Sequence, residues 1–454
     1  MSQQARDRLS VNFKDLPLEL VIDSIAYQTH YQFSYNSDIM PRGSLFTLKK
    51  QNIHVDTLLS ILLVGTNLVY QRNDDLIILK KANVNSKEIP KVNIRTVSGW
   101  VRDIEGKKPI SGVNVHLNGT MVGTSTDQYG NYEIKKIPPG SYELVFSYVG
   151  YEVVTHPLLV EEEFNQKVNA LMQERVQELG GVELVSTRFV KEVDWERYFK
   201  KFKIEFLGKT QNASRCEILN PNVLNFTESE DVDVFSAEAS QALIIQNDAL
   251  GYKIIYDLLS FTKDPEGTKE NGKVFFVSLT PENRKENRRW RNNRKKSYLG
   301  SINHFFISLI EGNYYRKGYR VYEISNPSDI TSQNKTPIDA KKLVKPTSNP
   351  YEWSLDFDGL IMVEYTKEIE SQQYVMEMNS TNDMHGIITS TLLDVSPNIQ
   401  RSVLELRDDS VLLDRFGQSK KSFGIKIMGY WAWERVADMM PAGYDPKEDN
   451  LINK

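Results

Sequence analysis

The sequence predicts a multidomain α+β protein: a small βαβ-type N-terminal domain, a β-sandwich, and a larger mixed α/β C-terminal domain rich in strands. A strand–helix–strand pattern occurs twice before residue 82, short strands with glycine turns follow residue 97, and helical and strand periodicities mix beyond residue 195. The chain has 454 residues, about three times the usual domain length of roughly 150, so it has room for three domains. We place them at residues 1–82, 97–187 and 188–454, with a linker at residues 83–96.

Composition and charge exclude several classes of protein. Hydrophobic residues make up 40% of the chain and charged residues 26%, which excludes disorder over the whole chain. Fifty-six basic and 60 acidic residues give a formal net charge of −4, so no overall field favours nucleic acid or anionic lipid. Cys216 is the only cysteine, which excludes an internal disulfide and a thiolate-rich metal site. No stretch approaches the roughly 18 apolar residues of a membrane helix, so we expect no transmembrane segment.

The first domain consists of two copies of one pattern. Alternation over residues 9–13 predicts a strand, and Pro17 opens a helix, because proline is favoured in the first turn. The second copy starts with a strand at residues 45–48 and ends with one at residues 76–79. Each helix carries apolar residues at i, i+3, i+4 and i+7, namely Leu18, Val21, Ile22 and Ile25 in the first and Val55, Leu58, Leu59 and Leu62 in the second. The polar, aperiodic residues after Lys81 indicate the linker.

The second domain shows short strands with turn chemistry between them. Residues 113–117, 132–134 and 142–146 alternate with a period of two. Glycines in the turns between these strands, such as Gly119 and Gly130, supply the positive φ that hairpins require. This pattern predicts a β-sandwich of roughly 80–90 residues.

The third domain is mixed. Leu243–Ile245 and Tyr252–Phe261 predict a hairpin, Lys273–Leu279 a third strand, and Ile302–Ile310 a helix. We expect further strands at Leu360–Tyr365, Tyr374–Met378, Val403–Leu406 and Val411–Leu413, and a long surface excursion over Ser325–Pro350.

Motifs for catalysis or cofactor binding are absent from the sequence. Residues 267–273 have the spacing of a phosphate-binding loop, but Val274 stands where the magnesium-binding hydroxyl belongs, so a hairpin loop is favoured. No His-Glu-x-x-His pair and no nucleophile elbow occur. We therefore expect no cofactor, no metal and no enzyme activity, with a site assembled from distant residues as the alternative.

A basic run beside an aromatic residue is the first candidate binding patch. Eight basic residues and one acidic residue lie between residues 284 and 296, around Trp290. An anionic lipid or acidic protein surface is one partner for such a run, a solvated helix face is the alternative, and nucleic acid is not expected. The residues chosen as the candidate anionic-partner patch are Arg288, Arg289, Arg291 and Arg294.

Tryptophans in the third domain are the second candidate patch, because aromatic faces line sugar-binding clefts. These residues are Trp290, Trp353, Trp431 and Trp433.

Structural roles explain the remaining candidate polar residues more simply than function does. His304 lies beside an apolar helix stripe and is expected to be a hydrogen-bonded structural residue, and Asp414 and its neighbours are expected to cap turns.

The first domain resembles the STN module, the short N-terminal domain of secretins and TonB receptors. The residues that carry this resemblance are Val11-Asn12-Phe13, Pro17-Leu18, Leu20, Leu45 to Leu48, Leu58-Leu59, Leu62-Leu63, Gly65-Thr66, Leu68 and Ile77-Ile78.

Residues 97–151 are similar to the carboxypeptidase-regulatory-like β-sandwich, which implies a transthyretin-like (prealbumin-like) fold. The residues are Val97-Ser98-Gly99, Val101-Arg102-Asp103, Pro109-Ile110, Gly112-Val113, Gly119-Thr120, Gly123-Thr124, Thr126-Asp127, Gly130-Asn131-Tyr132, Pro139-Gly140-Ser141-Tyr142 and Val149-Gly150-Tyr151.

The two modules in this order resemble the periplasmic front end of SusC-like TonB-dependent receptors, and Glu178–Ser186 is similar to the segment before the plug of such receptors. The third domain resembles the domain of unknown function that follows the regulatory module in stand-alone exported proteins. The carrying residues are Phe206-Leu207-Gly208, Ile218 to Pro221, Leu250 to Lys253, Trp290, Tyr298 to Ser301, His304-Phe305, Gly429-Tyr430-Trp431 and Met440-Pro441.

These resemblances imply a periplasmic or outer-membrane-associated protein whose signal peptide has been removed. The expected role is a non-catalytic interaction component of an outer-membrane protein complex, in TonB-dependent uptake or in outer-membrane protein assembly. Its partner would be an outer-membrane β-barrel or an envelope protein complex. The alternative is a carbohydrate-binding protein or an enzyme with its site in the C-terminal domain.

Overall fold

The computed structural model describes residues 7–81 with short gaps, 95–175 except 162 and 163, 187–189, 194–325 except 230–232, 335–380 and 399–449. The chain divides into two compact units, residues 1–92 and residues 93–453. The segment Glu178–Ser186 and most of the expected linker lie outside the described residues.

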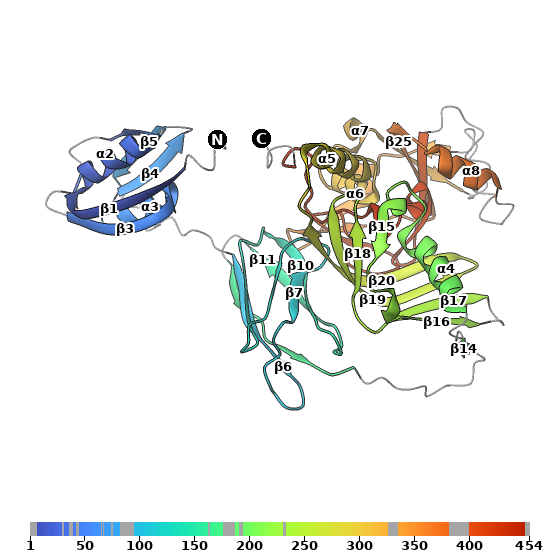
Figure 1. Ribbon diagram of the computed structural model, residues 1–454. Coiled ribbons are helices and arrows are strands. Elements are labelled where there is room, and N and C mark those ends of the chain that lie inside the picture. The colour runs from blue at the N-terminus through green and yellow to red at the C-terminus, as the bar shows by residue number, and fades with distance from the viewer. Residues whose placement is uncertain are drawn as a thin grey trace. The chain divides into compact units, whose positions relative to one another are not determined.

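The first unit contains the strand–helix–strand order twice (Figure 1). Strands β1 and β3 form an antiparallel two-stranded sheet, and a second sheet has the order β2–β5–β4, with β2 parallel to β5. The apolar stripes expected on α2 and α3 are buried, and Val21, Ile25 and Leu58 are fully inaccessible. The elements are β1 (Arg8–Pro17), α2 (Leu18–Gln28), β2 (Gln32–Ser34), β3 (Leu45–His54), α3 (Val55–Leu62), β4 (Leu68–Asn73) and β5 (Leu76–Lys81).

The second unit begins with a β-sandwich of two four-stranded sheets. One sheet has the order β11–β10–β7–β8, and in the other β6 pairs with β9, β12 and β13. Residues of both sheets, such as Val97 and Phe146, share one buried core, so the expected β-sandwich is present. The strands are β6 (Thr96–Asp103), β7 (Asn114–Leu117), β8 (Gly123–Ser125), β9 (Asn131–Lys135), β10 (Gly140–Ser147), β11 (Val154–Val160), β12 (Asn165–Lys167) and β13 (Ala170–Met172).

The next part of the chain forms a seven-stranded sheet around a long hairpin. Strand β19 pairs with β20 along its whole length on one side, and with β18 and β17 in turn on the other side. Helix α4 lies on this sheet, because its residues Phe202 and Phe206 are fully buried against Phe261. The elements are β14 (Thr187–Phe189), α4 (Trp195–Leu207), β15 (Cys216–Ile218), β16 (Leu224–Ser229), β17 (Val234–Ala239), β18 (Leu243–Asn247), β19 (Tyr252–Asp264) and β20 (Gly267–Ser278).

The last part contains a five-stranded sheet in the order β22–β21–β25–β26–β28 and a three-stranded sheet in the order β23–β24–β27. Helix α6 supplies Phe305 to their common core, where it meets Trp431. The elements are α5 (Arg284–Tyr298), α6 (Ile302–Ile310), α7 (Tyr314–Lys317), β21 (Tyr319–Ile324), β22 (Lys335–Pro337), η6 (Ala340–Leu343), β23 (Val344–Pro346), β24 (Glu352–Leu355), β25 (Leu360–Ile369), α8 (Gln372–Ser380), β26 (Ile399–Leu406), β27 (Val411–Asp414), β28 (Ile425–Gly429), α10 (Tyr430–Trp433) and η7 (Val436–Asp438).

Two of the expected elements differ in the structure. Residues 374–378 belong to helix α8 rather than to a strand, and the Ser371 hydroxyl accepts a hydrogen bond from the Tyr374 N–H at 3.2 Å in its first turn. A strand would bury Tyr374 and Met376 on one face, whereas Met376 is 67% exposed. The described part of residues 325–350 is not a plain surface excursion, because it contains β22, η6 and β23, with Ala340 buried in the core.

The expected loop at residues 267–273 is also different. These residues form the start of β20 and pair with β19, so the chain turns earlier, at Asp264–Gly267. The Asp264 carboxylate accepts hydrogen bonds from the N–H groups of Glu266 and Gly267 at 2.8 and 3.0 Å, which fixes this turn. A polar run is compatible with a strand here, because its side chains are only partly buried.

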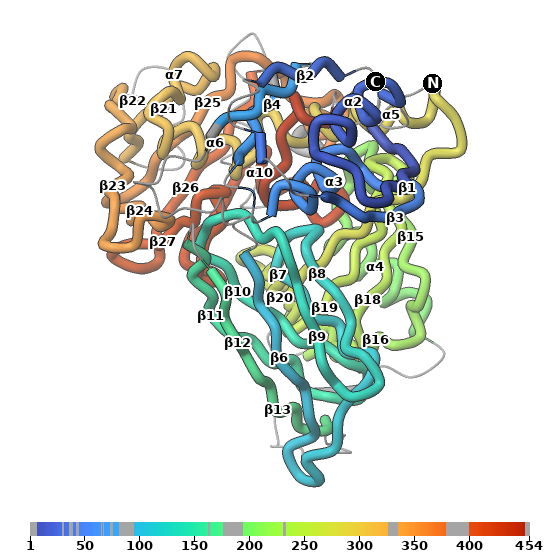
Figure 2. Tube along the Cα trace, turned by 90° about the vertical axis from the view of Figure 1, so that its left-hand side faces the viewer, coloured from blue at the N-terminus to red at the C-terminus, as the bar shows by residue number. Residues whose placement is uncertain are grey.

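The β-sandwich is joined to the C-terminal domain by backbone hydrogen bonds. Among the described strands, β20 pairs with β19 alone, and the turn at residues 118–120 lies on its other edge. The Gly119 N–H donates to the Val274 carbonyl at 2.7 Å, and the Phe276 N–H donates to the Thr120 carbonyl at 3.0 Å. Figures 1 and 2 both show β7 and β10 beside β20. The sandwich and the seven-stranded sheet thus share a continuous hydrogen-bonded edge.

Side chains complete this contact. The Lys273 ammonium lies 2.9 Å from the Glu143 carboxylate, and the Ser147 hydroxyl donates to Asp257 at 2.5 Å. His116, 1% exposed, packs its ring 5.0 Å from that of Phe275. Burial lowers the pKa of His116 to about 3, so this imidazole is neutral and acts as an apolar surface.

We expect Asn118→Ala to destabilise the second unit by about 1–3 kcal/mol, the cost of leaving a buried backbone donor unpaired. The Asn118 side-chain oxygen accepts from the buried Val274 N–H at 2.9 Å, and its amide donates to Glu143 at 3.0 Å. Urea unfolding of the full chain would measure the change. Asn114→Ala in the neighbouring strand is the control, because the Asn114 side chain bonds to no residue in the described part of the chain. Equal loss in the two variants would contradict this role of the turn.

Candidate functional site

The basic run forms helix α5, which is clamped onto the β18–β19 turn. Four successive carbonyls of this turn, at residues 248–251, accept hydrogen bonds from α5 side chains. Trp290 Nε1 donates to Asp248 at 2.8 Å and the Asn293 amide donates to Ala249 at 2.9 Å. The Arg294 guanidinium donates to the carbonyls of Leu250 and Gly251, at 2.6 and 3.2 Å. The Gly251 carbonyl also accepts from the Leu279 N–H at 3.0 Å. For the carbonyls of residues 248–250, the described residues show no backbone donor, and the helix satisfies them.

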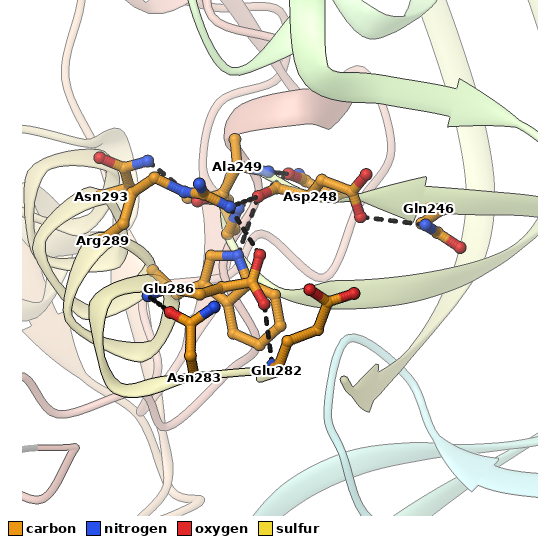
Figure 3. A network of polar contacts seen from close by, with 11 residues as sticks. Gln246, Asp248, Ala249, Glu282, Asn283, Glu286, Arg289 and Asn293 are labelled. Carbon is orange, nitrogen blue, oxygen red and sulfur yellow. Dashed lines mark hydrogen bonds and ion pairs between the residues drawn. The ribbon is translucent and has the colours of Figure 1, made fainter. Parts of the chain in front are cut away.

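The N-terminal end of α5 is held by a polar network, shown in Figure 3. The Asn283 side chain caps the helix by accepting from the Glu286 N–H at 3.0 Å. The Glu286 carboxylate accepts from the Glu282 N–H at 2.9 Å and from the Arg289 guanidinium at 2.8 Å. Arg289 also reaches the Asp248 carbonyl at 3.5 Å. One arginine of the candidate anionic patch is thus directed at the protein itself.

The four arginines of that patch do not share one surface. Arg294 is 8% exposed, forms an ion pair with Asp449 at 3.3 Å and lies 4.2 Å above the ring of Tyr252. Arg289 and Arg291 are half-buried, and Arg288 is exposed. The exposed basic residues of α5 are Arg284, Lys285, Arg288, Lys295 and Lys296.

The four tryptophans are also dispersed. Trp290 is buried under the 248–251 turn, and Trp431 is buried in the core, where its Nε1 donates to the Gly300 carbonyl at 2.6 Å. Trp353 lies on β24 in the three-stranded sheet. Trp433 lines a cavity, together with Tyr430.

That cavity has a volume of about 1050 Å³ and is lined by both halves of the C-terminal domain. The end of α4 and the loop that follows it, residues 203–214, form one wall, and residues 293–297 of α5 form the next. The end of β25, the start of α8 and the segment 430–438 complete it. Its size is in the range of cavities that hold small molecules.

Four carboxylates line this cavity. Glu377, on α8, is paired with Lys209 at 3.1 Å, and the other three come from separate elements. Glu368 is on β25, Glu434 follows α10, and Asp438 ends η7. Asp438 accepts hydrogen bonds at 2.8 Å from both the Thr210 hydroxyl and the Asn212 amide. None of the described side chains donates a hydrogen bond to Glu368 or Glu434.

Burial and mutual repulsion raise the pKa values of Glu368, Glu434 and Asp438. Burial raises the pKa of Glu368 from 4.5 to about 7, while Lys296 opposes this shift and Asp438 adds to it. Burial, then Asp438 and Glu368, raise the pKa of Glu434 well above its usual value. Burial raises the pKa of Asp438 to about 6 although its hydrogen bonds oppose the shift. Perturbed carboxyl groups that share a cavity are typical of functional sites.

The sequence analysis did not single out these carboxylates. Glu434 and Asp438 are four residues apart in the aromatic segment Tyr430 to Met440. Acidic residues within such an apolar segment were the one sequence feature that could have indicated a site here. Glu368 gave no signal, because it depends on an irregularity: between Tyr365 and Ile369 the pairing of β25 with β26 shifts by three residues. Such bulges re-aim side chains and are frequent at functional sites.

Other candidate groups have structural roles. His304 is buried and its Nδ1 lies 2.8 Å from the Tyr319 hydroxyl, which confirms the expected hydrogen-bonded histidine. Asp414 accepts from the N–H groups of Phe416 and Gln418 at 2.8 and 2.9 Å, which confirms the expected turn cap. Burial raises the pKa of the Cys216 thiol to about 12, so it carries no reactive thiolate.

Within the described residues, no group of three or more His, Cys, Asp or Glu side chains is arranged to hold a metal ion. Within the same residues, no helix has both the length and the apolar character needed to cross a membrane.

Comparison with known proteins identifies one domain. Residues 97–184 match the CarboxypepD_reg-like domain family, which agrees with the resemblance seen in the sequence. TonB-dependent receptor P39 of Formosa agariphila is 40% identical over 77 residues, which make up 17% of this chain. The matched part covers 7% of the length of that receptor.

Solved structures match only loosely. A C-terminal interface mutant of the type II cohesin–X-dockerin complex from Acetivibrio cellulolyticus has 22% identity and a TM-score of 0.16, over 19% of this chain and 63% of that chain. A DUF3823 family protein from Bacteroides uniformis has 10% identity and a TM-score of 0.14, over 41% of this chain and 100% of that chain. Scores this low carry no argument about the fold.

We expect Gly251→Ala to destabilise the protein more than Gly359→Ala, by about 2 kcal/mol or more, as for overpacking in a core. Both glycines have φ +69°, so both substitutions bring the same backbone strain. A Cβ at Gly251 would lie 2.3 Å from the buried Trp290 ring, whereas a Cβ at Gly359 has no atom within 4 Å. Thermal unfolding of both variants would measure the difference, and equal melting temperatures would contradict the clamp of α5 on the turn.

Glu368→Gln should gain stability relative to the native chain as the pH rises from 4.5 to 7, with a constant difference above pH 7. The pKa of Glu368 is raised from 4.5 to about 7 in the folded state. Between these two pH values the unfolded chain is ionised while the folded chain still holds the proton, so rising pH stabilises the unfolded state of the native chain. The glutamine variant does not titrate and loses nothing in this window. Thermal melts across the pH range would measure this.

Glu352→Gln is the control of opposite sign. Burial opposes the shift, but hydrogen bonds from Lys420 and Ser141 hold the pKa of Glu352 below its usual value. This variant should therefore lose stability relative to the native chain above pH 4.5, and the loss should vanish as the pH falls through the folded-state pKa. A pH-independent difference for Glu368→Gln would mean that this carboxyl is solvated.

Proposed function

We propose that the chain is a non-catalytic periplasmic interaction component of an outer-membrane protein complex, in TonB-dependent uptake or in outer-membrane protein assembly. The observation that carries this proposal is the CarboxypepD_reg-like domain at residues 97–184, together with the local similarity to a TonB-dependent receptor. In this chain the domain is bonded through the 118–120 turn to a further domain. The CarboxypepD_reg-like domain would therefore hold the C-terminal domain in a fixed orientation.

The first unit, which resembles an STN module, is the proposed docking part. Strands β1 and β3 pair with each other, and within the described residues the other edge of each has no strand partner. On α2, Leu20 is 53% exposed and Tyr27 is 93% exposed, and the two lie seven residues apart on one helix face. Exposed apolar groups of this kind support a contact with another protein.

The proposed role is non-catalytic. Support comes from two residues of types that catalysis often uses, since Cys216 and His304 are both buried and hydrogen-bonded within the fold. A reaction would need solvent access to a nucleophile or a base.

Helix α5 is a secondary candidate for an anionic partner. Only its exposed residues are available for that role, chiefly Arg284, Lys285, Arg288 and Lys295. Because Arg294 is engaged with the 248–251 turn, it is assigned to the fold and not to a partner.

A carbohydrate binder is the second candidate function. The observation that favours it is a cavity lined by aromatic and polar side chains, although Tyr430 and Trp433 are only 5% and 9% exposed, which leaves little of either ring for stacking on a sugar.

Deleting residues 1–92 should leave the second unit folded and remove one specific envelope partner. The expected result follows from the division of the chain, because residues 93–453 form a compact unit by themselves. Affinity purification from crosslinked native envelopes, with the full and truncated chains compared quantitatively, would measure partner loss. An outer-membrane β-barrel is the partner expected to disappear.

A double substitution, Leu20→Ser with Tyr27→Ser, tests the α2 face without removing the unit. It should weaken retention of the same partner at least about tenfold, as for loss of interface anchor residues. Glu19→Ser with Gln28→Ser is the matched control, because both residues are exposed on the same helix but lie about a quarter of a turn away from the stripe of Leu20 and Tyr27. Equal recovery of partners by the native, truncated and doubly substituted chains would refute the docking role.

A further inference from the structure

The cavity between the two halves of the C-terminal domain contains carboxylates that lack counter-ions among the described residues. Its carboxylates Glu368, Glu434 and Asp438 come from three elements, and only Asp438 receives hydrogen bonds, both from neutral donors. By contrast Glu377, at the same cavity, is paired with Lys209 at 3.1 Å. Glu368 and Glu434 form no ion pair within the described part of the chain. The fold thus places carboxylates in this cavity and leaves two of them without a counter-ion.

Cations are present only on exposed or half-buried positions of the cavity. Lys209 and Lys296 are exposed and Lys203 is half-buried. Lys209 is already engaged with Glu377, and Lys296 acts on Glu368 without forming an ion pair. Glu368, Glu434 and Asp438 are half-buried. Long lysine side chains keep their ammonium groups in water, so they compensate these carboxylates poorly.

A single metal ion does not fit this arrangement. Metal ions need three or more ligands around one point, and the described carboxylates are not grouped in that way. A ligand that satisfies carboxylates spread around a cavity must itself be extended.

A stacked sugar also fits poorly. The Trp433 side chain is 9% exposed, and its ring packs against Tyr374 at 5.6 Å and Tyr430 at 5.5 Å. Little of its face is free to stack on a pyranose ring. The edge of this aromatic cluster is better suited to an alkyl chain, which needs only apolar contact.

We propose that this cavity binds a ligand through one or more primary ammonium groups, with Glu434 and Glu368 as the anionic partners and Trp433 beside the ligand's alkyl chain. Two sources carry this chemistry: a free aliphatic diamine, and a lysine side chain of a peptide. The site is separate from the docking face on α2, and the proposal does not depend on the envelope role.

Proton release is the consequence that distinguishes this site from general charge attraction. Burial and the charge of Asp438 outweigh the effect of Lys296 and raise the pKa of Glu368 to about 7, so this group holds a proton about half of the time at pH 7. Burial, Asp438 and Glu368 also raise the pKa of Glu434, which favours its protonated form. A bound ammonium group favours the ionised forms, so binding at pH 7 expels protons into the buffer.

Isothermal titration of the full chain with diaminopentane would test the proposal. Pentanediol of the same length is the uncharged control, and acetyl-alanyl-lysyl-alanine amide is the peptide probe. Titration in two buffers of different ionisation enthalpy gives the number of protons released. Binding of both cationic probes identifies the ammonium group as the recognised feature, and binding of the diamine alone identifies a free amine as the ligand class.

Variants assign the binding to this cavity. Glu434→Gln and Glu368→Gln should each weaken binding about tenfold or more and reduce the proton release, because a charged partner is lost. Glu217→Gln, at an exposed position on β15, should change neither. Thermal melts would verify folding, and the glutamine variants should be at least as stable as the native chain at pH 7.

Three outcomes would overturn the proposal: no binding of either cationic probe at millimolar concentration, equal binding of the diol, or unchanged binding in both glutamine variants. Binding of a neutral oligosaccharide that is insensitive to Glu434→Gln would instead assign the cavity to sugars. Partner retention in the envelope experiment is unaffected by these variants, so failure of one proposal is distinguishable from failure of the other.

Discussion

The second unit depends on the edge that the β-sandwich turn and strand β20 share. Gly119 and Thr120 supply the backbone groups, and Asn118 accepts from the Val274 N–H, so three consecutive residues bridge two domains. An unpaired strand edge invites association with other chains, and here it is closed from within the molecule. Because the contact also buries the neutral His116 against Phe275, separating the domains would expose both open backbone groups and apolar surface. A CarboxypepD_reg-like domain attached in this way is a fixed platform for the domain that follows it.

Local patterns predicted the elements whose signals are local. The helix at Ile302–Ile310 occurs at the expected residues, because its apolar spacing and its Ser301 cap both act within one turn. The hairpin of β18 and β19 also occurs as expected. The prediction was wrong for residues 374–378, where alternation indicated a strand and the Ser371 cap starts a helix instead. It was also wrong for residues 267–273, since polar composition indicated a loop and pairing with β19 made a strand.

The basic run shows why composition alone could not identify a binding patch. Its arginines suggested an anionic partner, yet the carbonyl oxygens of residues 248–251 already provide a row of acceptors within the fold. A guanidinium carries several donors in a fixed geometry, which suits it to serve two such carbonyls at once, as Arg294 does. The spacing of Trp290, Asn293 and Arg294 on one helix face is what brings three donors to one turn. The relevant partner was 42–44 residues away in sequence, so no local pattern could show it.

The cavity illustrates the same limit at the site itself. Glu368 reaches it only because β25 bulges, and Glu434 and Asp438 reach it from a short segment that joins two cores. Each carboxylate is unremarkable in sequence, and their shared environment arises from packing of the two halves of the domain. Burying like charges without counter-ions costs stability, and a fold that needed only stability would place apolar residues there. Under our proposal, a bound ammonium group would turn an unfavourable arrangement in the empty protein into a favourable one in the complex.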